Sequence, residues 1–324
     1  MSYNLLLQAA LADTKKGAAA WEQYCRYANP QEADHLSTAL FPLIYRRFSP
    51  TSYEYKNVYR HTWCANQMQL AKLKEIVDQL RLASIKPCLL QGAPMLLSYY
   101  QDLGTRAFGD LEILISPNER QKTLECLKEM DVRVHTSLFP ESRVDQLFQN
   151  FTYRKIPAPE FPEATILCPE DQLLITLFQG LKDSFSPRWR VDAVMILRSS
   201  PLFDWEYFLS QITRLQLQWP IYKALRSLQQ QSLIDLPSSV LFLIEKYQPS
   251  IKERSYCRFL RQKPGNYLYV FNLYWQSHLR SAPTKNILSL LFTLPQFIKK
   301  TKKLSSWSEL IIFLYRKFFP KAVS

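Results

Sequence analysis

Glycine is scarce in this chain, which has 6 glycines among its 324 residues. Glycine supplies the backbone conformations of many tight turns, so its scarcity favours a helix-rich protein over one built from many short strands. Long apolar runs are missing as well. No stretch reaches about 18 uncharged apolar residues, so we expect no transmembrane helix. The N-terminal segment has no basic region ahead of a long apolar run, and we expect no signal peptide.

Paired cysteine motifs are also missing. The six cysteines are scattered, at positions 25, 64, 88, 126, 168 and 257. None of them forms the Cys-x-x-Cys spacing that is typical of zinc and redox sites. We therefore expect buried thiols in a reducing, cytoplasmic protein, rather than disulfides or zinc ligands.

Acidic residues are few in the second half of the chain. Residues 1–170 carry 19 Lys+Arg and 19 Asp+Glu, whereas residues 171–324 carry 22 and 9, so the whole net charge of +13 lies in the second half. Such an excess favours an anionic partner there, either phosphate, nucleic acid or a membrane surface. A basic solubilising face is the alternative.

Apolar residues make up 47% of the chain and aromatic residues 14%, a composition that predicts a folded globular protein rather than a disordered one. The first 83 residues indicate helices, because apolar residues recur at three- and four-residue spacing over 18–28, 33–48 and 54–83. We expect these helices to pack on a core and to carry no chemistry.

The segment 88–117 organises the rest of the chain. Its pattern predicts a strand at 87–91, a turn at 92–94, a helix to about 101 and a second strand at 111–115. Asp110 and Glu112 stand two residues apart at the start of that second strand, so their side chains lie on the same face. Paired carboxylates hold Mg²⁺, and a glycine turn lets backbone N–H groups approach a phosphate closely.

A second helix and a third strand follow. Ser116 and Glu119 form a capping box that opens a helix to about residue 130, and the alternation over 131–138 predicts a strand. The segment 139–165 is rich in proline, and we interpret it as a connector with one short helix near 143–149. By themselves these patterns predict only a small α/β sheet.

The residues of this segment resemble a family of uncharacterised bacterial nucleotidyltransferase-like proteins. The resemblance rests on Leu89-Leu90-Gln91-Gly92-Ala93, Gly104-Thr105-Arg106 and Asp110-Leu111-Glu112-Ile113-Leu114-Ile115. A second stretch also resembles the family, with Pro169-Glu170-Asp171, Arg188-Trp189-Arg190-Val191-Asp192 and Phe203-Asp204-Trp205. The resemblance covers residues 30–240.

The resemblance implies an α+β protein with a small mixed nucleotidyltransferase-type sheet, flanked by N-terminal helices and a larger C-terminal helical region. We expect N-terminal helices over 1–85, the α/β core over 86–167 and a basic, mainly helical region over 168–324. It also implies transfer of a nucleotidyl group from a nucleoside triphosphate (NTP) to an acceptor, which the sequence does not identify. Asp110 and Glu112 would be the catalytic, Mg²⁺-binding acids, and four residues would bind the nucleotide or its phosphates: Gln91, Gly92, Ala93 and Arg106.

The chain departs from the family pattern at three positions. Gln91 replaces a lysine, Glu112 replaces an aspartate, and Arg133 aligns with the acid that the third strand normally supplies. Asp131 could substitute for that acid if the strand shifted by two residues. His135 is expected to be a core histidine, and Asp192 is expected to pair with Arg188 or another helix. Together the departures predict weakened or lost catalysis.

Three hypotheses follow for the function. The first is a metal-dependent nucleotidyltransferase. The second is a degenerate relative that binds a nucleotide or a partner without chemistry, and it predicts Arg133 inside the acidic pair. The third is a scaffold that associates with nucleic acid or, peripherally, with a membrane, and it predicts an exposed basic and apolar face over 285–321. A terminal helix that packs on its own domain is the alternative to the third.

Overall fold

The computed structural model describes residues 2–28, 32–48, 53–139, 141, 145–182, 188–260, 262, 267–281, 287–302 and 304–318. The chain divides into two compact units. The first consists of Met1–Leu138, Tyr153–Ser210 and Ile221–Lys246, and the second of Phe139–Thr152, Gln211–Pro220 and Tyr247–Ser324. The predicted α+β class is confirmed, since helices flank one mixed sheet.

The sheet lies in the first unit. Its strands are β1 (Cys88–Leu90), β2 (Glu112–Leu114), β3 (Arg133–His135), β4 (Lys155–Ala158) and β5 (Phe161–Leu167), in the order β3-β2-β1-β5-β4. β2 runs antiparallel to β1 and parallel to β3, with Glu112 opposite Arg133. Parallel pairing therefore places the start of β3 directly beside the acidic start of β2.

The interpretation of 139–165 as a connector is wrong, because β4 and β5 form a hairpin that completes the sheet. β5 pairs in parallel with β1, and the Thr165 amide donates to the Pro87 carbonyl oxygen at 2.9 Å. The prolines concealed this hairpin in the sequence. They are tolerated because Pro157 lies on the edge strand β4 and Pro162 near the start of β5, positions where a missing N–H removes little from the ladder. The short helix predicted in this segment is α8 (Gln146–Gln149), and residues 142–144 lie outside the described part.

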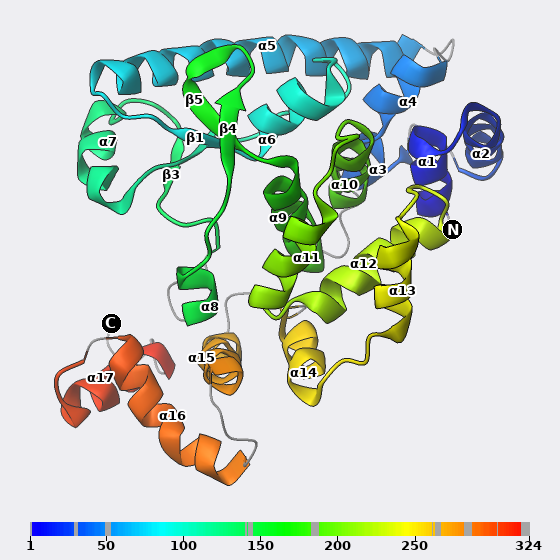
Figure 1. Ribbon diagram of the computed structural model, residues 1–324. Coiled ribbons are helices and arrows are strands. Elements are labelled where there is room, and N and C mark those ends of the chain that lie inside the picture. The colour runs from blue at the N-terminus through cyan, green and yellow to red at the C-terminus, as the bar shows by residue number, and fades with distance from the viewer. Residues whose placement is uncertain are drawn as a thin grey trace. The chain divides into compact units, whose positions relative to one another are not determined.

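The helical character predicted for the first 83 residues is confirmed. The helices are α1 (Ser2–Leu11), α2 (Thr14–Tyr27), α3 (His35–Thr38), α4 (Phe41–Phe48) and α5 (Tyr53–Leu82). α1 lies outside the predicted ranges, and the range 33–48 contains two helices. α5 runs the length of the sheet region (Figure 1). Its C-terminal half buries residues at helical spacing, namely Leu73, Ile76, Val77 and Leu80.

Between the strands, the chain forms short helices. The predicted helix to 101 is α6 (Gly92–Pro94) followed by the π-helix η2 (Met95–Tyr100). The capping box of Ser116 and Glu119 is confirmed, and it opens η3 (Pro117–Glu119) and then α7 (Arg120–Cys126).

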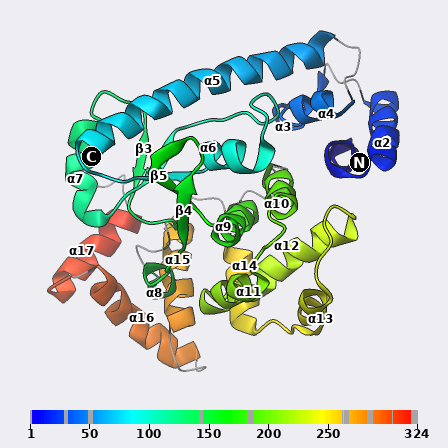
Figure 2. The ribbon, with the colours of Figure 1, turned by 45° about the horizontal axis from the view of Figure 1, so that its top comes forward.

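Helices complete both units. They are α9 (Pro169–Lys182), α10 (Arg188–Arg198), α11 (Trp205–Arg214), α12 (Gln218–Gln230), α13 (Ser238–Lys246), α14 (Ile251–Leu260), α15 (Tyr267–Ser281), α16 (Ile287–Thr301) and α17 (Trp307–Phe318). α9 and α10 lie side by side (Figure 2). Gly180 permits this approach, because a Cβ there would lie 2.3 Å from the Trp189 ring. Among the described residues, no helix is long and apolar enough to cross a membrane.

All six cysteines are free thiols, as the sequence predicted. Their predicted burial holds for Cys88, Cys168 and Cys257 but is wrong for the other three, which are exposed. Burial raises the pKa of the Cys88 thiol to about 11. The Cys88 thiol is therefore protonated at neutral pH and behaves as a small apolar group.

A buried asparagine holds the loop that leads into β2. Asn66 of α5 is fully buried, and its amide nitrogen donates to the carbonyl oxygens of Leu103 at 2.5 Å and Arg106 at 2.8 Å. Its side-chain oxygen accepts from the Phe108 amide at 2.8 Å. One side chain thus satisfies three backbone groups of the loop that carries Arg106.

We expect Asn66→Ala to lower the free energy of unfolding by about 2–4 kcal/mol, since it leaves three buried backbone groups without partners. Urea unfolding followed by circular dichroism measures this loss. The matched control is Gln67→Ala, an exposed neighbour on the same helix, which should change stability by less than about 0.5 kcal/mol. Equal losses in the two variants would show that the loop does not depend on the clamp.

Candidate functional site

Five of the six predicted site residues line one cavity of the first unit, with a volume of about 280 Å³. They are Gln91, Gly92, Arg106, Asp110 and Glu112. Ala93 is buried and does not line it. A larger cavity of about 600 Å³, between α5 and the β4–β5 turn, contains none of the six. The smaller cavity is therefore the candidate site.

The turn after β1 is tightly constrained. Gln91 adopts φ 60° and ψ −111°, a backbone conformation that residues other than glycine rarely take and that costs about 1–3 kcal/mol. Gly92 follows it under the Phe108 ring, where an added Cβ would lie 2.4 Å from the nearest ring carbon. The π-helix η2 begins three residues later. Strained backbone and π-helical turns both concentrate at functional sites.

The acidic pair is bound by two basic side chains of β3. Arg133 lies 2.6 Å from the Asp110 carboxylate through Nη2, and 3.5 Å from the Glu112 carboxylate through Nη1. His135 Nε2 lies 3.0 Å from the other Glu112 oxygen. His135 is 37% exposed, so the expectation of a core histidine is wrong. The register of β2 and β3 places Arg133 opposite Glu112, with no two-residue shift that would bring Asp131 to that place.

These contacts do not fit a Mg²⁺ site. Mg²⁺ requires near-octahedral oxygen ligands at close range, whereas here the guanidinium of Arg133 bridges the two carboxylates that would provide them. Among the described residues, no group of three or more His, Cys, Asp or Glu side chains is placed to hold a metal ion. In this structure the cation that pairs with Asp110 and Glu112 is the Arg133 side chain.

Arg106 does not pair with Asp110. Its Nε and Nη2 atoms donate to the two carboxylate oxygens of Asp192 on α10, at 2.8 and 2.9 Å, and the Tyr100 hydroxyl donates to the same carboxylate at 2.7 Å. Both members of the ion pair are less than a tenth exposed. Burial by itself would raise the pKa of Asp192, but the Arg106 guanidinium holds it below its ordinary value of 3.8. This ion pair therefore fixes the floor of the cavity.

The other residues that line the cavity were not predicted from the sequence. They come from α9, α10 and the loop before β2, and comprise Gly109, Thr176, Gln179, Gly180, Arg188, Trp189 and Asp192. Arg188 donates through Nη2 to the Ala107 carbonyl oxygen. Two buried nitrogen atoms of wall residues, Arg106 Nη1 and Trp189 Nε1, have no hydrogen-bond partner among the described residues. The Arg-Trp-x-x-Asp pattern at 188–192 was the available signal.

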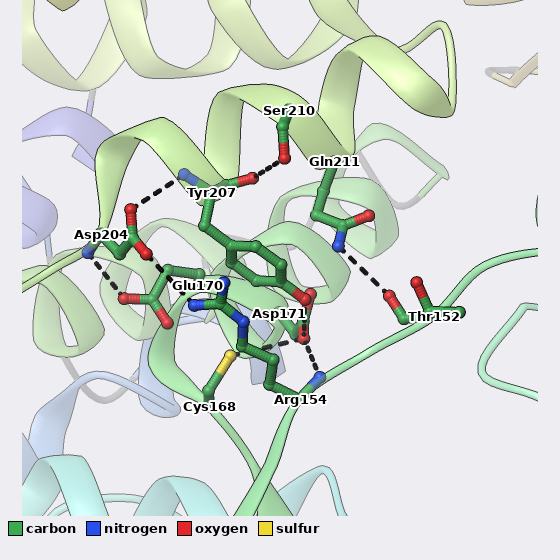
Figure 3. A network of polar contacts seen from close by, with 9 residues as sticks. All are labelled: Thr152, Arg154, Cys168, Glu170, Asp171, Asp204, Tyr207, Ser210 and Gln211. Atoms are coloured by element: carbon green, nitrogen blue, oxygen red, sulfur yellow. Dashed lines mark hydrogen bonds and ion pairs between the residues drawn. The ribbon is translucent and has the colours of Figure 1, made fainter.

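A second polar cluster in the first unit explains other motif residues (Figure 3). Asp171, near the start of α9, accepts from the Arg154 amide at 2.7 Å and the Tyr207 hydroxyl at 2.9 Å. Glu170 accepts from the Asp204 amide at 2.8 Å, and the Arg154 guanidinium stacks 3.6 Å from the centre of the Tyr207 ring. Burial raises the pKa of Asp171. This cluster joins the residue before β4 to α9, to the turn before α11 and to α11 itself.

The cavity thus combines Glu112 at the start of β2, Asp110 two residues before that strand, and the glycine turn after β1, in a protein of the α+β class. The model of one family, described as uncharacterised nucleotidyltransferase, matches residues 45–150 and 131–231, which together span more than half of the chain. The chain belongs to this family. No curated protein matches it, and no solved structure does.

We expect Arg106→Leu to lower the free energy of unfolding by about 3–5 kcal/mol at pH 7, because it leaves the Asp192 carboxylate buried without its cation. The loss should be smaller at pH 5. Burial raises the pKa of an unpaired Asp192, which then takes up a proton, whereas the wild-type pair contributes stability above pH 3.8 and loses it only below that value. Urea unfolding at both pH values measures the difference. Arg154→Leu, which removes an exposed ion pair, should cost much less and show no comparable pH effect.

Proposed function

We propose that this chain binds the triphosphate of a nucleotide in the candidate site without requiring a divalent metal, and that its nucleotidyl transfer is weakened or lost. The observation that carries this proposal is the position of Arg133, 2.6 Å from Asp110 and 3.5 Å from Glu112. The second hypothesis for the function, a degenerate relative without catalysis, predicted that Arg133 would lie inside the acidic pair. The family supplies the class of ligand, an NTP.

Electrostatics favour this arrangement over a metal site. A monovalent and a divalent cation about 4 Å apart repel by about 2 kcal/mol even in bulk water, which weakens metal binding about 30-fold. The positive charge of Arg133 also offsets part of the negative charge of the two carboxylates, which would otherwise repel a triphosphate. It is 62% exposed, so each of its ion pairs is worth only about 0–1 kcal/mol, and its guanidinium can turn toward a phosphate at little cost.

The other departures from the family pattern also favour nucleotide binding over catalysis. Gln91 lines the cavity with an amide, which donates hydrogen bonds to phosphate but does not neutralise it. In nucleotidyl transfer, an acceptor hydroxyl attacks the α-phosphorus and pyrophosphate leaves. The third strand offers Arg133 opposite Glu112 where an acid would help to position or deprotonate that hydroxyl. Binding is therefore retained better than turnover.

The proposal extends to the compartment. All six cysteines are free, which is typical of proteins in a reducing compartment. We therefore propose a cytoplasmic location.

Isothermal titration of the full chain with ATP and GTP, each in EDTA and in excess Mg²⁺, tests the proposal. We expect the wild-type dissociation constant for the bound nucleotide to change less than about threefold between the two conditions. Arg133→Gln should bind more weakly in EDTA and should gain a Mg²⁺ dependence of about 10- to 30-fold, because the repulsion of the metal is removed. Arg120→Gln, an exposed arginine of α7 outside the cavity, is the matched control and should behave as wild type.

The combined change Asp110→Ala and Glu112→Ala separates the hypotheses. We expect it to preserve or strengthen nucleotide binding in EDTA, since it removes two negative charges beside the triphosphate. Wild-type binding that requires Mg²⁺ and is abolished by this double change would instead establish a metal-dependent nucleotidyltransferase, and transfer of label from an α-labelled NTP would then measure its turnover. Absence of binding to any NTP in both conditions would rule out a nucleotide site.

A further inference from the structure

Helix α17 is apolar on two sides. Leu310 is buried in a small core with Tyr274, Leu294 and Ile298 of α15 and α16. Four large side chains on another side of the helix are exposed: Trp307 (52%), Ile311 (68%), Ile312 (51%) and Tyr315 (48%). Their spacing of four, five and eight residues from Trp307 puts them on one side of the helix. Packing in this small core therefore leaves these four apolar side chains of α17 exposed.

Helix α16, which packs against α15 and α17 in the second unit (Figures 1 and 2), also carries exposed apolar side chains. Leu291 and Phe292 of α16 are 49% and 82% exposed. We call these six residues of α16 and α17 the apolar face. Isolated exposed apolar residues are common, but six large ones on two helices that pack together mark an interaction surface.

Lysines stand beside the apolar face. Lys299 Nζ lies 5.4 Å from the centre of the Trp307 ring, which belongs to the apolar face. Lys302 Nζ lies 5.7 and 5.8 Å from the rings of Tyr274 and Phe313, which belong to the small core or pack against it. Lys300, between them on α16, is exposed. Only one acid, Glu309, lies in the described part of α17, and it accepts hydrogen bonds from Ser305. Positive charge therefore lies beside the Trp307 end of the apolar face.

We propose that the apolar face binds the surface of an anionic lipid bilayer, with α17 lying in the plane of the interface. Ile311, Ile312 and Phe292 would enter the acyl boundary, while Trp307 and Tyr315 have the amphipathic rings that are enriched at the headgroup level. Lys299, Lys300 and Lys302 would contact anionic headgroups. A nucleic acid fits less well, because its phosphates gain nothing from exposed isoleucines, and its binding depends on cations and on stacking.

Flotation of the full chain with vesicles tests this proposal. We expect recovery with vesicles of 3:1 phosphatidylcholine and phosphatidylglycerol, and at least tenfold weaker binding to phosphatidylcholine alone. The pair of changes Ile311→Ser and Ile312→Ser should weaken binding to anionic vesicles at least tenfold. Lys299→Gln, Lys300→Gln and Lys302→Gln together should do the same and should remove the preference for anionic lipid.

Matched controls distinguish binding by the apolar face from non-specific binding of the protein to vesicles. Leu202→Ser removes a leucine of the first unit that is 95% exposed, and the triple change Lys72→Gln, Lys74→Gln and Lys128→Gln removes three exposed lysines of that unit. Both should bind vesicles as wild type does. Circular dichroism checks that every variant is folded.

Three outcomes would overturn the proposal. The first is no recovery with either vesicle, as when another surface of the chain covers the apolar face. The second is an equal loss of binding in the controls. The third is tight, salt-sensitive binding of a fluorescent single-stranded oligonucleotide with no binding to vesicles, which would assign the lysines to nucleic acid instead.

Discussion

The buried ion pair of Arg106 and Asp192 is the interaction on which the site depends. It joins the loop before β2 to α10, and the Tyr100 hydroxyl adds the end of η2 to the same carboxylate. A buried ion pair contributes less to stability than its close distances suggest, because both charges lose their hydration. Its importance is in positioning, since removing either partner leaves the other charged and buried. Loss of either partner alone would therefore disturb the wall of the cavity, to which both residues contribute.

Arg133 has a different physical role from Arg106. It is mostly exposed and is held by two carboxylates that would hold a metal in an active nucleotidyltransferase. Its contacts are weak and can rearrange, but the strand register fixes its backbone opposite Glu112, within reach of both acids. A fixed change of one charge thus changes the chemistry of the site while the fold around it persists.

Much of the fold was predictable from local patterns. The N-terminal helices, the strands at 88–90 and 112–114, and the capping box at Ser116 all follow from periodicity and local hydrogen bonding. The β4–β5 hairpin was not predictable in this way. Its strands contain prolines, and β5 is stabilised by pairing with β1, more than 70 residues earlier in the chain. Long-range pairing of this kind leaves little trace in a local pattern.

For the site, the sequence by itself determined which side chains were available: paired acids, a glycine turn, and an arginine in place of the third acid. Only the tertiary structure decided their partners. The register of β2 and β3 places Arg133 beside Asp110 and Glu112. The packing of α10 lets Arg106 form an ion pair with Asp192 rather than with Asp110. The physical reason is that a charged side chain pairs with whichever opposite charge the fold brings within about 4 Å. That neighbour is set by strand register and helix packing across distant segments of the chain.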